Sequence, residues 1–320
     1  MKPKIFVTYP LADAAIQQLR NHFEVTLNTE SRILPPEELK AQCKDKDGIL
    51  CLLTDAIDKS LLDACPSLKA VSNYAVGYNN IDISTANDRK IPINYTPGVL
   101  TDPTADLTFA LILATTRRVV EADAFLRAGK FTGWSPDLLL GFDINGKTLG
   151  IIGMGRIGLA VAKRAAAFNM SVIYSATRDK ALPGYQFMGL EQLLQTADVI
   201  SLHLPYNAKN HHLINAQRLS QMKKTAFLIN TARGPIVDEA ALAKALMQGQ
   251  IAGAGLDVFE EEPKVHPDLL KLSQVVLLPH VGSATGDTRT RMALMAANNL
   301  IQSFFGQKTE NVVNPQVFGA

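Results

Sequence analysis

The chain has 320 residues, which at about 150 residues per domain favours two domains. Hydrophobic residues make up 47% of it and charged residues 19%, a balance typical of a globular protein with a sizeable core rather than of a disordered one. The 32 Lys and Arg residues nearly balance the 30 Asp and Glu residues, so the formal charge of +2 leaves no broad basic field for nucleic acid.

The apolar segments are short. The stretch 109–114 is among the longest, far below the roughly 20 residues that a membrane helix needs, and residues 1–7 show no signal-peptide pattern. Cys43, Cys51 and Cys65 have no CxxC spacing, and their odd number argues against a disulfide framework. We therefore expect a cytoplasmic protein whose partners are neither membranes nor nucleic acids.

The first hundred residues alternate strand and helix signals. The patterns predict strands at 5–8, 24–27, 48–53, 68–72 and 91–94, with helices at 12–22 and from Pro35-Pro36 onward. The continuous apolar run at 48–53 is typical of a strand that is buried on both faces. Alternation of this kind predicts a parallel sheet covered by helices on both faces.

A second alternating series follows a pair of helical stretches, which begin at Thr101 and Val119. Its strands are expected at 149–152, 171–174, 199–202, 226–230, 253–257 and 275–278, with helices at 157–168 and 190–195. Six such strands match a dinucleotide-binding sheet. An amphipathic helix at 288–305 closes the chain. The fold class is therefore α/β with two sheets, and hinges are expected at 97–98 and 282–286.

The sharpest motif is the GxGxxG sequence at 153–158, between a predicted strand and a predicted helix. Gly153 permits a tight turn, Gly155 lets the backbone approach a pyrophosphate, and Gly158 lets the helix pack close to the sheet. The free N–H groups at the helix N-terminus attract phosphate. A glycine-rich turn alone would be weak support, but its place between strand and helix favours a dinucleotide site.

The segment after the next strand bears on the choice of cofactor. An NAD-binding fold usually places a carboxylate about 20 residues after the glycines to hold the ribose. Ser175 stands there instead, and Thr177 and Arg178 follow it. Hydroxyls and a guanidinium suit a 2′-phosphate, so we expect NADP(H) to be preferred. The alternative is that Arg178 is solvated and that NAD(H) is also accepted.

Three polar clusters follow later strands, at 230–234, 257–263 and 278–283. Because ligands bind at the carboxyl ends of strands in open α/β sheets, an arginine, a carboxylate and a histidine should converge beside the cofactor. These groups suit carbonyl reduction. His280, with an unperturbed pKa of about 6.5, can protonate the oxygen that the hydride leaves negative. Arg233 can grip a substrate carboxylate, and a carboxylate can orient the imidazole.

Each of these residues has an ordinary structural alternative: Arg233 as a helix cap, Glu262 in a solvated acidic loop, His280 as a loop histidine. Their joint occurrence at strand ends behind a dinucleotide turn favours the catalytic interpretation. His211 and His212 are adjacent, and no carboxylate cluster accompanies them in the sequence. We therefore expect a solvated helix start there, and no metal site.

The chain closely resembles the D-isomer-specific 2-hydroxyacid dehydrogenases, and among them the glyoxylate/hydroxypyruvate reductase branch. The resemblance runs from end to end and rests on these segments: NYAVGYNNID at 73–82, NYTPGVLTDPTADLTFALIL at 94–113, the glycine turn, HLP at 203–205, NTARGPIVDEAAL at 230–242, GLDVFEEEP at 255–263 and PHVGSAT at 279–285. Many members of the family carry an acidic residue at the position of Ser175. Its absence here is similar to the NADPH-using reductases.

The resemblance implies roles for single positions. Arg233 would bind substrate, Glu262 would be the carboxylate partner, and His280 would be the acid/base histidine that also touches substrate. Val76 and Gly77 would hold the substrate carboxylate through their backbone N–H groups. The implied cofactor contacts, beyond the turn glycines and the 175–178 segment, are Arg156, Ile157, Leu204, Pro205, Thr231, Ala232, Asp257 and Gly282.

The family fold also implies a Rossmann-type dinucleotide-binding domain at 100–287, inserted into a flavodoxin-like substrate-binding domain formed by 1–99 and 288–320. It suggests a homodimer through the region Thr101–Trp134, in which Trp134 either packs at the interface or contacts a neighbour's substrate.

The resemblance and the site together predict NADPH-dependent reduction of small 2-oxo acids, glyoxylate to glycolate and hydroxypyruvate to D-glycerate. One alternative is an NAD-linked dehydrogenase of a bulkier acid such as 2-ketogluconate or a phenylpyruvate. Another is a nucleotide-sensing binding protein that resembles the dehydrogenase-like corepressors.

Overall fold

The computed structural model describes residues 1–319, which divide into two compact units. Residues 1–100 and 284–319 form the first unit, and residues 101–283 form the second. Each unit is an α/β sandwich with its own parallel sheet, so the predicted fold class is confirmed. Within the described residues, no helix combines the length and the apolar character that crossing a membrane requires.

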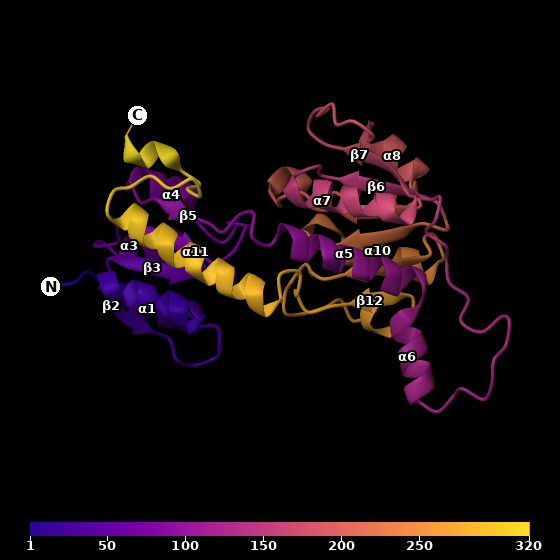
Figure 1. Ribbon diagram of the computed structural model, residues 1–320, viewed down its shortest axis with the longest axis horizontal. Coiled ribbons are helices and arrows are strands. Elements are labelled where there is room, and N and C mark those ends of the chain that lie inside the picture. Colours follow the sequence, from indigo (N-terminus) through magenta and orange to yellow (C-terminus); the bar gives the residue numbers. More distant parts are fainter. Residues whose placement is uncertain (320) are drawn as a thin grey trace. The chain divides into compact units, whose positions relative to one another are not determined.

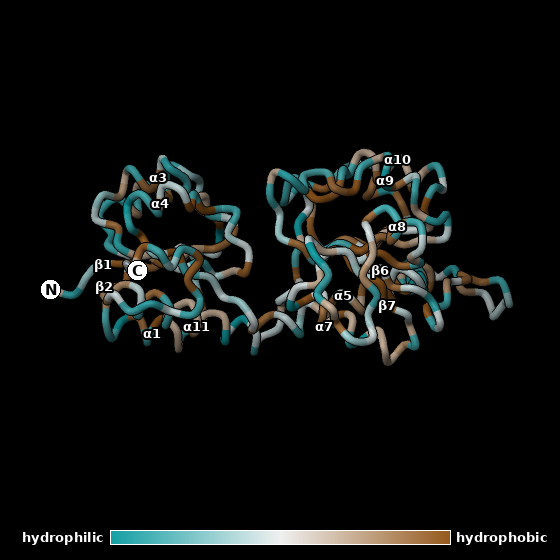
Figure 2. Tube along the Cα trace, turned by 90° about the horizontal axis from the view of Figure 1, so that it is seen from above, coloured by the Kyte–Doolittle hydropathy of each residue, from teal (hydrophilic) through white to brown (hydrophobic). Residues whose placement is uncertain are grey.

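The first unit has a five-stranded parallel sheet in the order β2-β1-β3-β4-β5, the flavodoxin-like order. Its strands are β1 (Lys4–Val7), β2 (Glu24–Leu27), β3 (Gly48–Cys51), β4 (Ala70–Asn73) and β5 (Ile93–Asn94). Its helices are α1 (Asp13–His22), α2 (Pro36–Cys43), α3 (Lys59–Ala64), α4 (Ile83–Asp88) and α11 (Gly286–Phe304). Helices α1 and α11 cover one face of the sheet, and α3 and α4 cover the other (Figures 1 and 2).

The closing helix α11 belongs to the first unit because its buried face packs on β3 and β4. Polar contacts fix it there: Ser72 Oγ donates to Ala296 O at 2.8 Å, and Asn299 Nδ2 donates to Tyr95 O at 2.9 Å. Segments more than 200 positions apart in the sequence thus share one core.

The second unit has a seven-stranded parallel sheet in the order β12-β11-β10-β9-β6-β7-β8. Its strands are β6 (Thr148–Ile152), β7 (Ser171–Ser175), β8 (Gln186–Phe187), β9 (Val199–Leu202), β10 (Phe227–Asn230), β11 (Gly253–Leu256) and β12 (Val275–Leu277). Its α-helices are α5 (Thr101–Thr116), α6 (Val119–Arg127), α7 (Arg156–Ala165), α8 (Leu190–Thr196), α9 (Ala216–Leu219) and α10 (Glu239–Met247). Strand order reverses between β6 and β9, as in Rossmann-type sheets.

The sequence predicted six strands for this sheet and missed β8. This edge strand has only two residues, both exposed, so it carries no apolar pattern that could reveal it. The predicted helix at 157–168 also ends earlier, since α7 stops at Ala165 and a 3₁₀ turn covers Ala166–Phe168.

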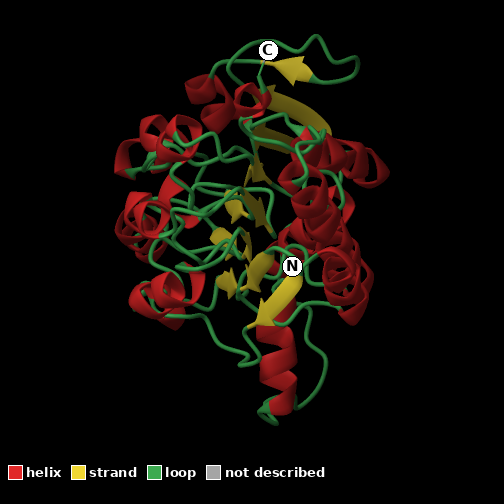
Figure 3. Ribbon diagram, turned by 90° about the vertical axis from the view of Figure 1, so that its left-hand side faces the viewer, coloured by secondary structure: helices red, strands yellow, loops and turns green. Residues whose placement is uncertain are grey.

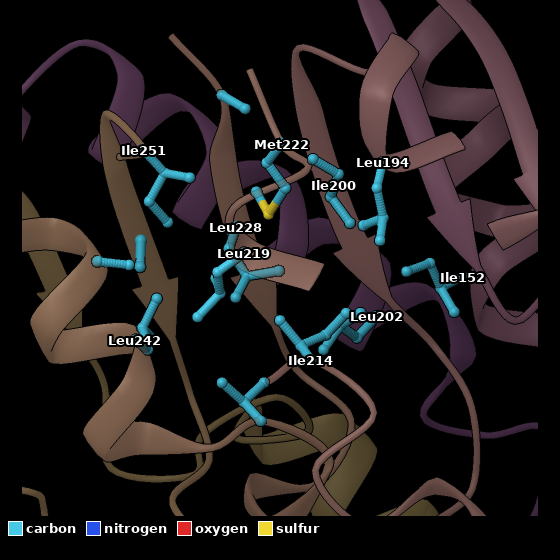
Figure 4. Packing of buried hydrophobic residues seen from close by; sticks show 14 of the residues in the cluster. Ile152, Leu194, Ile200, Leu202, Ile214, Leu219, Met222, Leu228, Leu242 and Ile251 are labelled. Carbon is cyan, nitrogen blue, oxygen red and sulfur yellow. The ribbon is translucent and has the colours of Figure 1, made fainter. Parts of the chain in front are cut away.

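Buried apolar residues form a cluster on each face of the seven-stranded sheet. Hydrophobic segments lie along its strands in Figure 2, and Figure 3 shows helices flanking the strands. On one face, Leu228 of β10 packs with Ile200 of β9, Leu242 of α10 and Ile251, each at most 2% exposed (Figure 4). Burying one such side chain stabilises the fold by about 1.5–3 kcal/mol. This packing holds the strands in register, so their carboxyl ends lie along one edge of the sheet.

Candidate active site

The turn after β6 has the backbone that a pyrophosphate requires. Gly153 has φ +98°, and a Cβ placed on it would lie 2.4 Å from the carbonyl oxygen of His203. A Cβ on Gly158 would lie 2.3 Å from Gly153 O, whereas one on Gly155 would meet nothing within 4 Å. Gly153 and Gly158 thus permit close packing, and Gly155 leaves open space above the backbone. The three glycines have the geometry expected from the motif.

Helix α7 begins directly at this turn, and Gly155 at its N-cap offers no side chain to its first N–H groups. Arg156 and Ile157 form the first turn of the helix, with Arg156 exposed. The free N–H groups and the helix dipole favour an anion at this point. The turn therefore fits the pyrophosphate of a dinucleotide.

Ser175 ends β7 next to the glycine turn, where its carbonyl accepts the Gly153 N–H at 2.9 Å. Thr177 and Arg178 follow it and are exposed. The nearest following carboxylate, Asp179, is held elsewhere: its Oδ1 accepts from the Tyr174 hydroxyl at 2.5 Å and from Ala181 N at 2.8 Å. These bonds hold the pKa of Asp179 below its usual value.

Lys180, which was not predicted from the sequence, donates from its ammonium to the carbonyl of Met154 inside the glycine turn at 2.8 Å. Its backbone N–H donates to the Tyr174 hydroxyl at 2.9 Å. The buried Tyr174 thus fixes both Asp179 and Lys180. A lysine in an exposed loop gives no pattern in the sequence that could have identified it.

The structure brings together the histidine and the carboxylate that were expected to pair: His280 Nδ1 lies 2.8 Å from Glu262 Oε2. The other oxygen of Glu262 accepts from Phe259 N at 3.0 Å. Burial alone would raise the pKa of Glu262, but the hydrogen bond from His280 and the charges of His280 and Arg233 outweigh it and hold the pKa below its ordinary value. Glu262 is therefore ionised near neutral pH and can orient the imidazole.

Arg233 follows β10 in a turn that Asn230 organises. Asn230 Oδ1 accepts from Ala232 N, and its Nδ2 donates to Arg233 O, each at 3.0 Å. Burial lowers the pKa of Arg233, and the Glu262 charge opposes that shift. An arginine still keeps its proton near neutral pH. The structure thus brings Arg233, Glu262 and His280 into one electrostatic group.

Gly234 holds this turn against the Glu262 loop. A Cβ at Gly234 would lie 1.8 Å from both the carbonyl carbon and the oxygen of Phe259, a distance that no side chain could occupy. The backbones after β10 and β11 therefore touch only because residue 234 is glycine. This contact sets the separation between Arg233 and Glu262.

Asp257 fixes the position of His280. Its carbonyl accepts the His280 N–H at 2.8 Å, and its carboxylate oxygens accept from Val281 N at 2.7 Å and Gly282 N at 2.8 Å. Burial raises the pKa of this carboxyl group. Asp257 and Gly282 were expected to contact cofactor, and these bonds show in addition that Asp257 positions the histidine.

The remaining expected cofactor contacts lie at neighbouring strand ends. Leu204 and Pro205 follow β9, and the backbone N of Leu204 borders Gly153. Thr231 follows β10, where its hydroxyl lies 3.0 Å from that of Thr108 on α5, and the half-buried Ala232 comes next.

Val76 and Gly77 belong to the other unit, in the loop after β4. Asn73 Nδ2 donates to Gly77 O at 2.9 Å and shapes this loop. Within residues 1–319, the N–H groups of Val76 and Gly77 have no hydrogen-bond acceptor. They are thus available for an anion.

Comparison with known proteins places the chain in the class of NAD(P)-dependent oxidoreductases. The chain belongs to the D-isomer-specific 2-hydroxyacid dehydrogenases: the model of that family's NAD-binding domain matches residues 109–282. It is 48% identical to the glyoxylate reductase of Thermococcus litoralis over 325 residues, covering 99% of this chain and 98% of the relative. The family resemblance seen in the sequence is confirmed.

Two solved structures are also similar. The glyoxylate reductase from Paecilomyes thermophila matches with a TM-score of 0.89 and 34% identity, covering 98% of this chain and 99% of its own. The NADPH-dependent glyoxylate/hydroxypyruvate reductase of Sinorhizobium meliloti, in complex with NADP and malonate, matches with a TM-score of 0.90 and 36% identity, covering 99% and 98%.

The imidazole of His203, beside the glycine turn, should make the stability of the fold depend on pH. Its Nε2 lies 2.8 Å from Ser201 Oγ, its Nδ1 is buried without a partner among the described residues, and burial lowers its pKa to about 3. When the pH is below about 6.5, the ordinary pKa of histidine, this residue is protonated in the unfolded chain but stays neutral in the folded chain. The contribution of His203 to the free energy of unfolding is therefore fully present above pH 6.5 and is lost as the pH falls toward 3.

We expect the free energy of unfolding to drop by up to about 1.4 kcal/mol per pH unit from this residue below pH 6.5. Urea titrations of the wild type and of His203→Asn between pH 7 and pH 4 measure it, with the exposed His22→Asn as control. The wild-type curve and the control curve should fall more steeply than that of His203→Asn. Parallel slopes for all three would show that His203 is protonated in the folded chain.

Proposed function

We propose that this protein is an NADPH-dependent reductase of small 2-oxo acids, converting glyoxylate to glycolate and hydroxypyruvate to D-glycerate. The main observation behind this proposal is the 2.8 Å contact between His280 Nδ1 and Glu262 Oε2. The charge of Arg233 acts on the same carboxylate. The names of the similar proteins support the same substrates. In this proposal the second unit binds the dinucleotide.

The reaction assigns one task to each group. The bound cofactor supplies a hydride to the 2-carbon of the substrate. Arg233 binds the substrate carboxylate and polarises the neighbouring carbonyl. Because Nδ1 of His280 faces Glu262, its Nε2 is the nitrogen that donates a proton to the carbonyl oxygen. The Glu262 carboxylate stabilises the positive charge of the imidazolium before that transfer.

The first test of this assignment compares His280→Ala with Arg233→Ala. His280→Ala removes the proton donor and should lower kcat about 10²–10⁴-fold. Arg233→Ala removes the carboxylate anchor and should raise KM for glyoxylate by about two orders of magnitude, because a charge-assisted pair is lost. Steady-state kinetics with glyoxylate and hydroxypyruvate, over both cofactors, measures these effects.

Lys271→Ala, an exposed change in the same unit, serves as the control and should leave both constants unchanged. Near-normal kinetics in both active-site variants would refute the assigned site. A panel that also includes 2-ketogluconate and phenylpyruvate distinguishes this function from that of a dehydrogenase for bulkier acids. A protein that binds nucleotide without any turnover would instead be the binding protein that resembles the corepressors.

The preference for NADPH rests on the charges that surround Ser175. Thr177 and Arg178 offer a hydroxyl and a guanidinium, and Lys180 adds an ammonium at the glycine turn. Asp179, which would repel a 2′-phosphate, is held by Tyr174 and Ala181. The hydroxyl of Tyr174 therefore supports NADPH binding indirectly, because it holds Asp179 and Lys180 in place.

Tyr174→Phe tests this arrangement, since it releases the Asp179 carboxylate and the Lys180 backbone together. We expect KM for NADPH to rise about tenfold, whereas KM for NADH stays nearly constant, because only the 2′-phosphate senses the released charge. Tyr185→Phe, a half-buried tyrosine in the same unit, is the matched control. Equal increases for both cofactors would mean that Tyr174 acts only on the fold.

The proposed homodimer rests on exposed apolar side chains on α6 and in the segment that follows it. Helix α6 has no buried residue, and with its following segment it extends away from the sheet of its own unit (Figure 1). Seven large apolar residues are at least 36% exposed there: Val119, Val120, Leu126, Phe131, Trp134, Leu138 and Leu140. A second chain that covers them would remove this surface from water.

Light scattering of the full chain should therefore give twice the monomer mass. The double variant Leu126→Ser/Trp134→Ser should shift it toward the monomer, because both side chains are more than 60% exposed and lose apolar contact area. Leu270→Ser, 64% exposed elsewhere in the unit, should leave the mass unchanged. A monomeric wild type would exclude the dimer.

A further inference from the structure

A pair of adjacent histidines lies outside the proposed active site and meets a carboxylate there. His211 and His212 follow a 3₁₀ turn at Ala208–Asn210. The His212 N–H donates to Pro235 O at 2.9 Å, and Ile214 forms a parallel bridge with Val237. This segment therefore runs beside the chain that leads from β10 into α10. No carboxylate lies near the pair in the sequence, but the fold brings one to it.

That carboxylate is Glu260, 48 positions after His212. Its backbone N–H donates to Glu239 Oε1 at 2.6 Å, and its own Oε2 accepts from Glu239 N at 3.4 Å. Glu239 is only 5% exposed, so this reciprocal pair fixes Glu260 firmly. Its remaining oxygen, Oε1, forms a hydrogen bond with His212 Nε2.

Three metal-ligating groups converge as a result. One donor atom from each of His211, His212 and Glu260 lies within 4.8 Å of the other two. The two imidazole rings stack, with centroids 3.9 Å apart and planes tilted by 20°. Zn–N and Zn–O bonds of about 2.0–2.2 Å place ligand atoms closer together than this limit. Because a metal ion lies in the plane of each imidazole that binds it, the two stacked rings must turn out of their stack to bind one ion.

The outer nitrogen of each histidine faces an oxygen atom. Nδ1 of His212 lies 4.0 Å from Asp238 Oδ2, and Nδ1 of His211 lies 3.3 Å from the Tyr206 hydroxyl. Histidines that bind metal through Nε2 usually donate their Nδ1–H to such an oxygen, which fixes the ring and its tautomer. A metal bound at Nε2 of His212 would replace the hydrogen bond between that nitrogen and Glu260 Oε1.

We propose that His211, His212 and Glu260 bind a single Zn²⁺ ion through the two Nε2 atoms and Glu260 Oε1. Two imidazoles and one carboxylate suit zinc rather than Mg²⁺ or Ca²⁺, which take oxygen ligands. Water completes the tetrahedron, since His211 is exposed. The proton between His212 and Glu260 moves to Nδ1, where it faces Asp238. No step of this proposal depends on the reductase activity.

The site is separate from the catalytic pair but shares its loop. Glu260 lies two positions before Glu262, whose carboxylate faces His280 instead of the adjacent histidines. Zinc binding at Glu260 would therefore hold the same loop from its other side. A test of the site must distinguish it from His280 and Glu262, which also offer an imidazole and a carboxylate to a metal ion.

Isothermal titration of the chelator-treated full chain with Zn²⁺ is the direct test. We expect one ion per chain, and visible absorption typical of tetrahedral Co²⁺ when cobalt replaces zinc. His211→Asn, His212→Asn and Glu260→Gln should each weaken binding more than tenfold, and Tyr206→Phe by about tenfold through the outer contact. His280→Ala and the remote His22→Asn should bind zinc like the wild type.

Circular dichroism checks that each variant folds, and Tyr206→Phe preserves the test if a ligand variant does not. The proposal is overturned if the wild type binds no zinc, or if the ligand variants bind it as the wild type does. It is equally overturned if His280→Ala is the variant that loses the ion, since the metal would then sit on the catalytic pair.

Discussion

The hydrogen bond between His280 and Glu262 depends on the backbones around it more than on the two side chains. Asp257 accepts three N–H groups from residues 280–282 and thereby fixes the histidine, while Phe259 N fixes the carboxylate. Gly234 lets the Arg233 turn reach the same loop. In the proposed function this pair must keep its geometry through a catalytic cycle, and the network of short backbone contacts stabilises that geometry without requiring bulky side chains.

The sheet brings these loops together. Strands β6, β9, β10, β11 and β12 are parallel and in register, so the glycine turn, the Leu204 segment, the Arg233 turn and the Asp257 loop all leave the same edge. A parallel sheet whose strand order reverses at β6 and β9 leaves a crevice at that point, which is where the glycine turn lies. The chemistry can therefore be spread over more than a hundred residues of sequence and still act at one place.

Much of this could be predicted from the sequence, because the signals are local. Apolar runs bounded by turn residues indicated the buried strands, and GxGxxG between strand and helix indicated the phosphate turn. The two-residue edge strand β8 was missed because it buries nothing. Lys180 and Tyr174 were missed because their contacts depend on how a loop folds back. The interpretation of His211 and His212 considered only carboxylates nearby in sequence, and Glu260 arrives through tertiary contacts that no local pattern encodes.

The three consecutive glutamates at 260–262 show how one short loop can serve different purposes. Glu260 faces His212 and is tied to α10 through Glu239, Glu261 is exposed and pairs in a bridge with Lys264, and Glu262 faces His280. Three consecutive glutamates therefore lie in three different environments, which the composition of the loop alone cannot distinguish. Backbone direction decides which imidazole each carboxylate reaches. A charge change at residue 260 and one at residue 262 should consequently act on different histidines, although both alter the same acidic loop.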